Sequence, residues 1–472
     1  MKFKTNVAIG AVFVALLAFV YFYEIKGGEE RRQEAEKSKQ LFAFQDDDAQ
    51  RLELLRGDDA LVLDKGTGGW NLSAPMTDGA DQEAVERYLR NLLECEREKV
   101  VVDSAAASAE EAAQYGLDAP RLKVRLQTED GAEQVVAFGS DSPTDRFTYA
   151  QLQGDNPEIF VVRAWRFDNL DKRAFDLRDR RVLAFAKDEV MQVQRWGAGG
   201  AAVLARAEPG WQMREPVAAR ADADAVDGLL DKIDQAEIEA FVAEDPGADS
   251  LATYGLGERA SQVEIALLVG EDRAEKRLAI GGADEQGRWY ARDASRPQVF
   301  LVDSTLVQEL IKGISDLRDK EPLRFEREQV QRIVLTRGTA TAFAADKDTS
   351  SVWHLSEPMG RDAKSWKINS LLSDLEQLEV ADFAEELPAE AAPAFSIELL
   401  GEGQALLNVR FSTAAGTSYL QQEGDDAVYV VSSDDFAELD LDIDDVAQAP
   451  KKPAAPAASS EEDPDDGGAD SP

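Results

Sequence analysis

"GGWNLSAP" (residues 68–75) is the first of three related stretches that set the organisation of this chain. "PGWQMREP" occupies residues 209–216 and "SVWHLSEP" occupies residues 351–358, so the three tryptophans follow one another at steps of 141 and 142 residues. A fixed long period of this kind indicates tandem structural units. The length of 472 residues also agrees with about three domains, at a prior of roughly 150 residues for each domain.

The shared pattern is Trp-x-(Leu/Met)-x-x-Pro, which we interpret as the end of a hairpin that closes onto a helix. Side chains alternate between the two faces of a strand, so the tryptophan and the residue two positions later share one face. Proline cannot donate to a sheet ladder and therefore stops the strand. This pattern favours core tryptophans over ligand-stacking surfaces. The motif residues are Trp70, Leu72, Pro75, Trp211, Met213, Pro216, Trp353, Leu355 and Pro358.

The sequence on either side of each motif predicts the same elements three times. Upstream, residues 52–65, 193–206 and 334–347 alternate apolar and polar residues around a glycine-containing turn, which is typical of a hairpin. Downstream, apolar residues at i, i+4 and i+7 predict an amphipathic helix; they are Val85, Leu89 and Leu92, then Val226, Leu230 and Ile233, then Ile368, Leu372 and Leu375. Further hairpins follow. Strands grouped around helices, without βαβ alternation, predict an α+β fold with antiparallel sheets.

A second motif, Tyr-Gly-Leu, follows the predicted helix in the first two repeats. It is formed by Tyr115, Gly116 and Leu117, and again by Tyr254, Gly255 and Leu256. Glycine adopts positive φ without strain, so each motif is predicted to turn the chain into the next strand. The third repeat lacks this motif and is shorter.

The expected boundaries between segments follow from shifts in composition and from the similarity of "DLRDRRVLAF" (176–185) to "DLRDKEPLRF" (316–325). We expect six segments: a cytoplasmic stub with a transmembrane anchor (1–24), a charged stalk (25–46), repeat 1 (47–185), repeat 2 (186–325), a shortened repeat 3 (326–446) and an acidic tail (447–472). The tail is rich in Pro, Ala, Ser and acids, which cannot form a core, and it is predicted to be disordered.

The N-terminus predicts an uncleaved signal anchor. Lys2 and Lys4 precede an uncharged run over residues 7–23, which is just long enough to span a membrane and ends in aromatic residues. The positive-inside rule keeps the N-terminus in the cytoplasm and sends the rest of the chain across the membrane. The expected location is therefore the inner membrane of a bacterium, with a single pass and the bulk in the periplasm.

The composition argues against most kinds of chemistry. A net charge of −40 opposes binding to nucleic acid. The single cysteine, Cys95, allows no intramolecular disulfide and is expected to be a half-buried, inert thiol within the helix. The single histidine, His354, alternates with core residues and is expected to face water. We predict no catalytic residue, no metal site and no cofactor, and therefore no enzyme.

These motifs together resemble a bacterial family of domains of unknown function. Members of that family are membrane-anchored envelope proteins, often encoded beside auxiliary subunits of gliding-motility-type ABC transporters. The resemblance covers about residues 48–446 and implies a non-catalytic accessory role near a transporter. We expect the three repeats to form an interaction arm that is accessory to a transporter or envelope complex. Two alternatives stay open: a periplasmic polysaccharide-binding module and a glycan hydrolase built on a pair of carboxylates.

Overall fold

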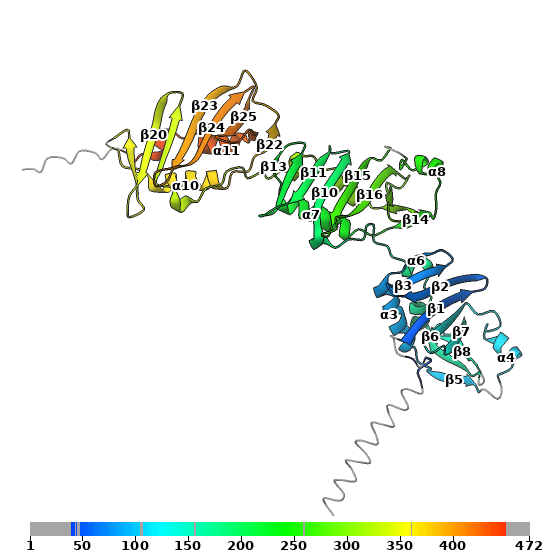
Figure 1. The fold of residues 1–472 in the computed structure, drawn as a ribbon. Coiled ribbons are helices and arrows are strands. Elements are labelled where there is room, and N and C mark those ends of the chain that lie inside the picture. The colour runs from blue at the N-terminus through cyan, green and yellow to red at the C-terminus, as the bar shows by residue number, and fades with distance from the viewer. Residues whose placement is uncertain are drawn as a thin grey trace, which may run out of the picture. The chain divides into compact units, whose positions relative to one another are not determined.

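A computed structural model describes residues 39–42, 44, 48–103, 107–154, 157–257, 260–359 and 361–449 (Figure 1). The predicted anchor, the first part of the predicted stalk and the tail from residue 450 onward lie outside these residues. None of the helices in the described residues combines the length and the apolar character that a membrane span requires.

Three sheets follow one another along the chain, and their strand orders correspond. The first has nine strands in the order β4-β3-β2-β1-β6-β7-β8-β9-β5, and the second has nine in the order β13-β12-β11-β10-β15-β16-β17-β18-β14. The third has eight, in the order β21-β20-β19-β23-β24-β25-β26-β22. The α+β class with antiparallel strand pairing is confirmed.

The strands have the following bounds. In the first sheet they are β1 Ala49–Arg56, β2 Asp59–Gly66, β3 Gly69–Ala74, β4 Asp78–Gly79, β5 Lys99–Val102, β6 Leu122–Thr128, β7 Glu133–Asp141, β8 Phe147–Gln153 and β9 Ile159–Arg163. In the second they are β10 Val190–Gly197, β11 Ala202–Arg206, β12 Trp211–Glu215, β13 Ala219–Arg220, β14 Ala240–Ala243, β15 Val263–Val269, β16 Ala274–Ala283, β17 Trp289–Asp293 and β18 Val299–Val302. In the third they are β19 Arg332–Arg337, β20 Ala340–Lys347, β21 Trp353–Glu357, β22 Asp382–Ala384, β23 Ala392–Leu400, β24 Ala405–Ala414, β25 Thr417–Gln422 and β26 Val428–Val431.

Helices connect and cover these strands. The α-helices are α3 Gln82–Leu93, α4 Ala109–Gln114, α5 Ala164–Leu170, α6 Ala174–Leu177, α7 Ala223–Asp234, α8 Ala248–Thr253, α9 Ser304–Leu310, α10 Ser365–Glu376, α11 Ser433–Leu439 and α12 Ile443–Val446. Short 3-10 helices occupy Lys187–Glu189, Ser315–Leu317 and Arg327–Gln329. The helices α3, α7 and α10 are those that the apolar triads predict, and all nine triad residues are buried.

The chain divides into two compact units. The first contains Met1–Ala184, Asp234–Ala260 and Ile280–Ser304, and the second contains Phe185–Ile233, Ser261–Ala279 and Thr305–Pro472. Within the first, α3 packs its buried face on the first sheet, with Tyr88 donating a hydrogen bond to the backbone oxygen of Leu170 on α5 at 3.1 Å. Within the second, α10 and α11 contribute to the core of the third sheet.

Each sheet buries one face and leaves much of the other to solvent, as antiparallel sheets commonly do. In β1 the core face carries Leu52 and Leu54, which are fully buried. The opposite face carries Arg51 and Glu53, which are joined by an ion pair of 2.8 Å. This alternation is the period-2 pattern from which the hairpins are predicted.

Two predicted boundaries need correction. The stalk is predicted to end at residue 46, but Leu41 and Phe42 are 4% and 0% exposed and belong to the core of the first sheet. The tail is predicted to begin at residue 447, but Ala447 is 1% exposed and forms a bridge with Ala363. Both errors arise because a few apolar residues at the end of a charged segment are enough to join a core.

Candidate functional site

The motif tryptophans lie at the first or second residue of β3, β12 and β21 and are buried. Trp70, Trp211 and Trp353 are 4%, 3% and 1% exposed. Their partners two residues later, Leu72, Met213 and Leu355, are 0%, 1% and 8% exposed. These six side chains face the helices and are not accessible to a ligand. The prolines Pro75, Pro216 and Pro358 follow the strands, each after a cis peptide bond.

The two Tyr-Gly-Leu motifs cap short helices that the sequence analysis does not predict. Gly116 and Gly255 have φ of +69° and +71°, in the region that favours glycine. Tyr115 and Tyr254 pack against Tyr149 and Tyr290, with ring centroids 4.6 and 4.8 Å apart. The motif leucines, Leu117 and Leu256, are 6% and 8% exposed. The two motifs therefore hold α4 and α8 to their sheets.

The single histidine lies on the surface and the single cysteine is buried. The His354 ring is 60% exposed and its Nε2 lies 2.8 Å from Asp348 Oδ2 on the surface. Cys95 is expected to be half-buried within the helix, but it is fully buried and lies after the end of α3. Burial raises the pKa of its thiol to about 12. In the residues that the structure describes, no group of three or more His, Cys, Asp and Glu side chains is arranged to hold a metal ion.

Successive repeats are connected by an arginine of the repeated "DLRD" sequence. Arg178 is 2% exposed, and its guanidinium carbon lies 3.3 Å from the centroid of the Phe241 ring on β14. Its two terminal nitrogens donate to Glu244 Oε1 and Oε2 at 2.8 and 2.7 Å, and its Nε donates to Asp78. We call this arrangement the arginine clamp.

The electrostatics of the arginine clamp favour the charged form. Burial opposes the charge of Arg178, but the hydrogen bonds that it donates to Glu244 and Asp78 outweigh burial and raise its pKa. A bidentate pair to a carboxylate and a stacked aromatic ring suit the planar guanidinium and not an ammonium group. Because Asp78 precedes and Glu244 follows Arg178 by many residues, the clamp joins distant parts of the chain.

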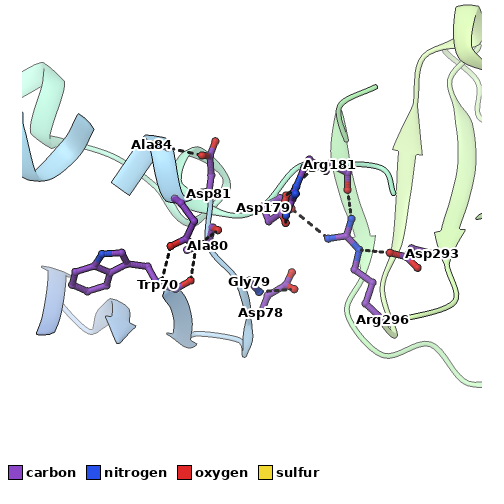
Figure 2. A network of polar contacts seen from close by, with 11 residues as sticks. Trp70, Asp78, Gly79, Ala80, Asp81, Ala84, Asp179, Arg181, Asp293 and Arg296 are labelled. Carbon is purple, nitrogen blue, oxygen red and sulfur yellow. Dashed lines mark hydrogen bonds and ion pairs between the residues drawn. The ribbon is translucent and has the colours of Figure 1, made fainter. Parts of the chain in front are cut away.

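A second polar network lies beside the clamp, and Figure 2 shows Arg296 within it. Arg296 donates to the backbone oxygen of Asp179 at 3.4 Å and to that of Arg181, while its Nε lies 3.8 Å from Asp293 Oδ2. The Asp179 carboxylate accepts from Arg181 Nη2 at 2.7 Å. Burial opposes ionisation of Asp179, but its hydrogen bonds with Arg181 hold its pKa below the usual value.

The second "DLRD" sequence, at residues 316–319, has an arginine that stacks on a phenylalanine ring as Arg178 does but forms no ion pairs of the kind that Arg178 forms. Arg318 lies 3.6 Å from the centroid of the Phe383 ring on β22. The register of β13 puts Ala219 where β4 has Asp78, so one carboxylate is missing. Within the described residues, Arg318 Nε is buried without a hydrogen-bond partner. Burial accordingly lowers the pKa of Arg318, the opposite of the direction at Arg178.

Arg178→Met is expected to lower the free energy of unfolding by about 2–3 kcal/mol, because Asp78 keeps its charge at a position where it is only 10% exposed. The cost stays below that of a fully buried pair because Glu244 is 45% exposed and water can solvate it. Urea denaturation measures the change. Arg318→Met is the matched comparison and is expected to cost less, because it breaks no ion pair. Equal costs would contradict the role given to Asp78 and Glu244.

Two surface hollows lie on the third and first sheets. One, of about 440 Å³, is lined in part by Arg332, Asp346 and Gly401 on the third sheet. Another, of about 400 Å³, is lined in part by Asp48, Thr128 and Glu129 on the first sheet. Neither hollow contains a residue of the Trp or Tyr-Gly-Leu motifs.

Comparison with protein families gives two overlapping matches to one family, described as a domain of unknown function, over residues 70–214 and 211–397. Together these matches span more than half of the chain. The protein belongs to the DUF4340 family. Each match begins at a motif tryptophan, extends past the next one and contains one of the two stacked arginines, Arg178 or Arg318. No curated protein and no solved structure matches the chain.

Proposed function

We propose that this DUF4340 protein is a non-catalytic interaction arm. It is held in the inner membrane by residues 7–23, extends into the periplasm as three tandem repeats, and serves a transporter or envelope complex through protein contacts. What supports the proposal is that the motif residues are buried in the cores while Trp366 on the third repeat is exposed.

The observation that carries the proposal is Trp366, which is 69% exposed in the first turn of α10. The corresponding positions of α3 and α7 carry Glu83 and Asp224, acids that suit the positive end of a helix. Met359, in the turn directly after β21, is 89% exposed. Tryptophan and methionine are enriched at protein interfaces relative to the rest of the surface. The third repeat thus offers an apolar contact where the other two offer charge.

Trp366→Glu is expected to reduce crosslinked partner recovery at least tenfold, since tryptophan often contributes about 2 kcal/mol or more at an interface. The measurement is co-purification of the full chain from its own membranes after crosslinking. Trp165→Glu is the matched control, because Trp165 is also exposed, at 53%, but lies on α5 of the first repeat. Recovery of the chain alone, or equal recovery with both variants, would contradict the proposal.

A further inference from the structure

One end of the first repeat is formed by segments that are distant in the sequence. The backbone oxygen of Lys39 accepts a hydrogen bond at 2.7 Å from the amide of Arg97, which lies just before β5. Arg163, the last residue of β9, forms an ion pair of 2.7 Å with Glu98. Arg166 of α5 forms an ion pair of 2.8 Å with the residue that ends α3. The starts of β5 and α5 and the end of α3 therefore meet beside Lys39, and we call this region the entry end.

The entry end exposes apolar side chains next to cations. Trp165, the second residue of α5, is 53% exposed, and its ring centroid lies 4.2 Å from the guanidinium carbon of Arg166. Val100 and Val101 of β5 are 37% and 39% exposed. Lys99, at the start of β5, is also exposed. The surface thus combines an indole ring, two aliphatic side chains and positive charge.

The other two repeats lack this combination at the equivalent positions. The helices α5, α9 and α11 each have seven residues and end in a buried leucine, which puts Thr305 and Asp434 at the position of Trp165. The strands β5, β14 and β22 correspond by their pairing with β9, β18 and β26. At the positions of Arg97, Lys99, Arg163 and Arg166, the second repeat has Ile238, Ala240, Asp303 and Leu306, and the third has Val380, Asp382, Ser432 and Asp435.

The first repeat is also the one that follows the proposed anchor. Residues 24–38, fifteen in number, separate the predicted span from Lys39. A chain of this length reaches at most about 50 Å when it is fully extended. The entry end is therefore tethered within that distance of the bilayer. A short tether gives a high effective concentration, so even a weak contact with the membrane would stay occupied.

We propose that the entry end is a membrane-contact surface, with Trp165 at the level of the lipid headgroups and Lys99 beside their phosphates. The inference rests on the proposed anchoring by residues 7–23 and concerns a surface separate from the partner contact at Trp366. Tryptophan is enriched at membrane–water interfaces because its ring is amphipathic. Lysine and arginine stems cover apolar surface while their charged groups approach anionic headgroups.

The distribution of charge supports this orientation. The chain has a net charge of −40, so most of its surface is repelled by an anionic bilayer. Residues 94–99 and 158–166, which form the entry end, contain four cations and four acids, so their charges cancel. Three ion pairs join arginines to acids within this set. The entry end can therefore approach anionic lipid with little of the repulsion that the rest of the chain experiences.

Fluorescence quenching in vesicles tests the proposal. The full chain is inserted into vesicles of phosphatidylglycerol and phosphatidylcholine that contain lipids with a nitroxide on the headgroup, and Val101→Cys carries a fluorophore. Val242→Cys is the matched control, because Val242 has the equivalent position in β14 and is 38% exposed. We expect quenching at position 101 to exceed that at position 242 by about twofold or more, since a residue in contact with a membrane lies within about 5–10 Å of the headgroups. Cys95 does not take the label, because it is buried.

A charge variant shows which side chains make the contact. Trp165→Glu with Lys99→Glu is expected to reduce quenching at position 101 to the value at position 242, because it removes the ring and adds acids that anionic lipid repels. The melting temperature should stay the same, since both residues are exposed. Thr305→Glu, at the equivalent exposed position of the second repeat, is expected to leave quenching at position 101 unchanged.

The possible failures are distinguishable by flotation of the vesicles. A chain that floats with the vesicles but shows equal quenching at positions 101 and 242 would overturn this inference and leave the anchoring intact. A chain that does not float would overturn the anchoring and the inference with it. If the entry end binds a partner protein instead, the label will also be unquenched, because the vesicles contain only the purified chain.

Discussion

Arg195→Leu is expected to lower the free energy of unfolding by about 3–5 kcal/mol, one of the two largest effects that this structure predicts. Arg195 is 2% exposed on the core face of β10 and donates to the backbone oxygens of Gly199 and Lys312 at 2.7 and 2.6 Å, and also to those of Gly200 and Leu310. Leucine leaves these buried carbonyls without a donor. Burial lowers the pKa of Arg195 despite the opposing charge of Asp316, and within the described part of the chain its guanidinium forms no ion pair with a carboxylate.

The other repeats show why an arginine is needed at this place. Arg56 donates to the backbone oxygen of Lys172 and Arg337 to that of Leu441, which are the carbonyls equivalent to Lys312 after the matching helix. By strand register, the positions equivalent to Arg195 are the core residues Leu54 and Leu335. The second repeat therefore carries this arginine two residues earlier in the strand than the other repeats do, on the core face and not at the strand end. It still donates a hydrogen bond to the equivalent carbonyl.

The difference is explained by Gly197, which occupies the position where the other repeats have Arg56 and Arg337. Its φ is +103°, and a Cβ there would lie 2.4 Å from the backbone oxygen of Gln262. Adding Gly197→Arg to the Arg195→Leu variant is therefore not expected to restore its free energy of unfolding. Urea denaturation provides the measurement, with Arg277→Leu as the control, because Arg277 is 43% exposed and should cost about 1 kcal/mol or less. Rescue by Gly197→Arg would contradict this account.

Trp211→Ala is the other large effect, with an expected cost of about 3–5 kcal/mol from the cavity that it creates. Trp211 is 3% exposed, and its Nε1 donates to Asp227 Oδ1 of α7 at 3.2 Å. The same bond joins Trp353 to Asn369 of α10 at 3.0 Å, so the tryptophans attach their strands to the helices. Thermal unfolding of the full chain measures the effect.

Trp196→Ala is the matched control for this substitution, because Trp196 lies on the same sheet but is 38% exposed. We expect the control to change stability by about 0.5 kcal/mol or less. An unchanged melting temperature for the Trp211 variant, together with loss of binding to a glycan, would contradict the core role. That outcome would instead favour the polysaccharide-binding alternative that the sequence leaves open.

Much of the fold follows from local patterns in the sequence. The hairpins around residues 57 and 131 each have alternating strands beside a positive-φ glycine, and both are present. The triad on α3 follows from helical spacing, and Asp81 adds the expected cap by accepting from Ala84 N at 3.0 Å. The sequence analysis misses the short helices α5, α9 and α11, because seven residues hold too few turns to show a clear period.

The candidate site was predictable only in part. The repeated "DLRD" sequence marks where the first two repeats end, and Phe241 and Phe383 recur at nearly the same period. These two signals, taken together, were the available hint of a stacked arginine. The carboxylates were not predictable, because Asp78 and Glu244 lie 100 and 66 residues from Arg178 and the chain contains 92 acids. Chance alone offers many such pairs.

The sequence by itself determined the number of repeats, the hairpins, the main helices and the absence of a histidine or cysteine cluster, since these depend on periodicity and composition. Only the tertiary structure decided which arginine forms buried ion pairs, which arginine donates to backbone carbonyls from the core, and which tryptophans are exposed. The physical reason is that the burial and the interaction partners of a charged or aromatic side chain depend on residues that are distant in the sequence. Arg178, Arg195 and Arg318 are the same residue type in similar repeats, yet one pairs with acids, one with carbonyls and one with a ring alone.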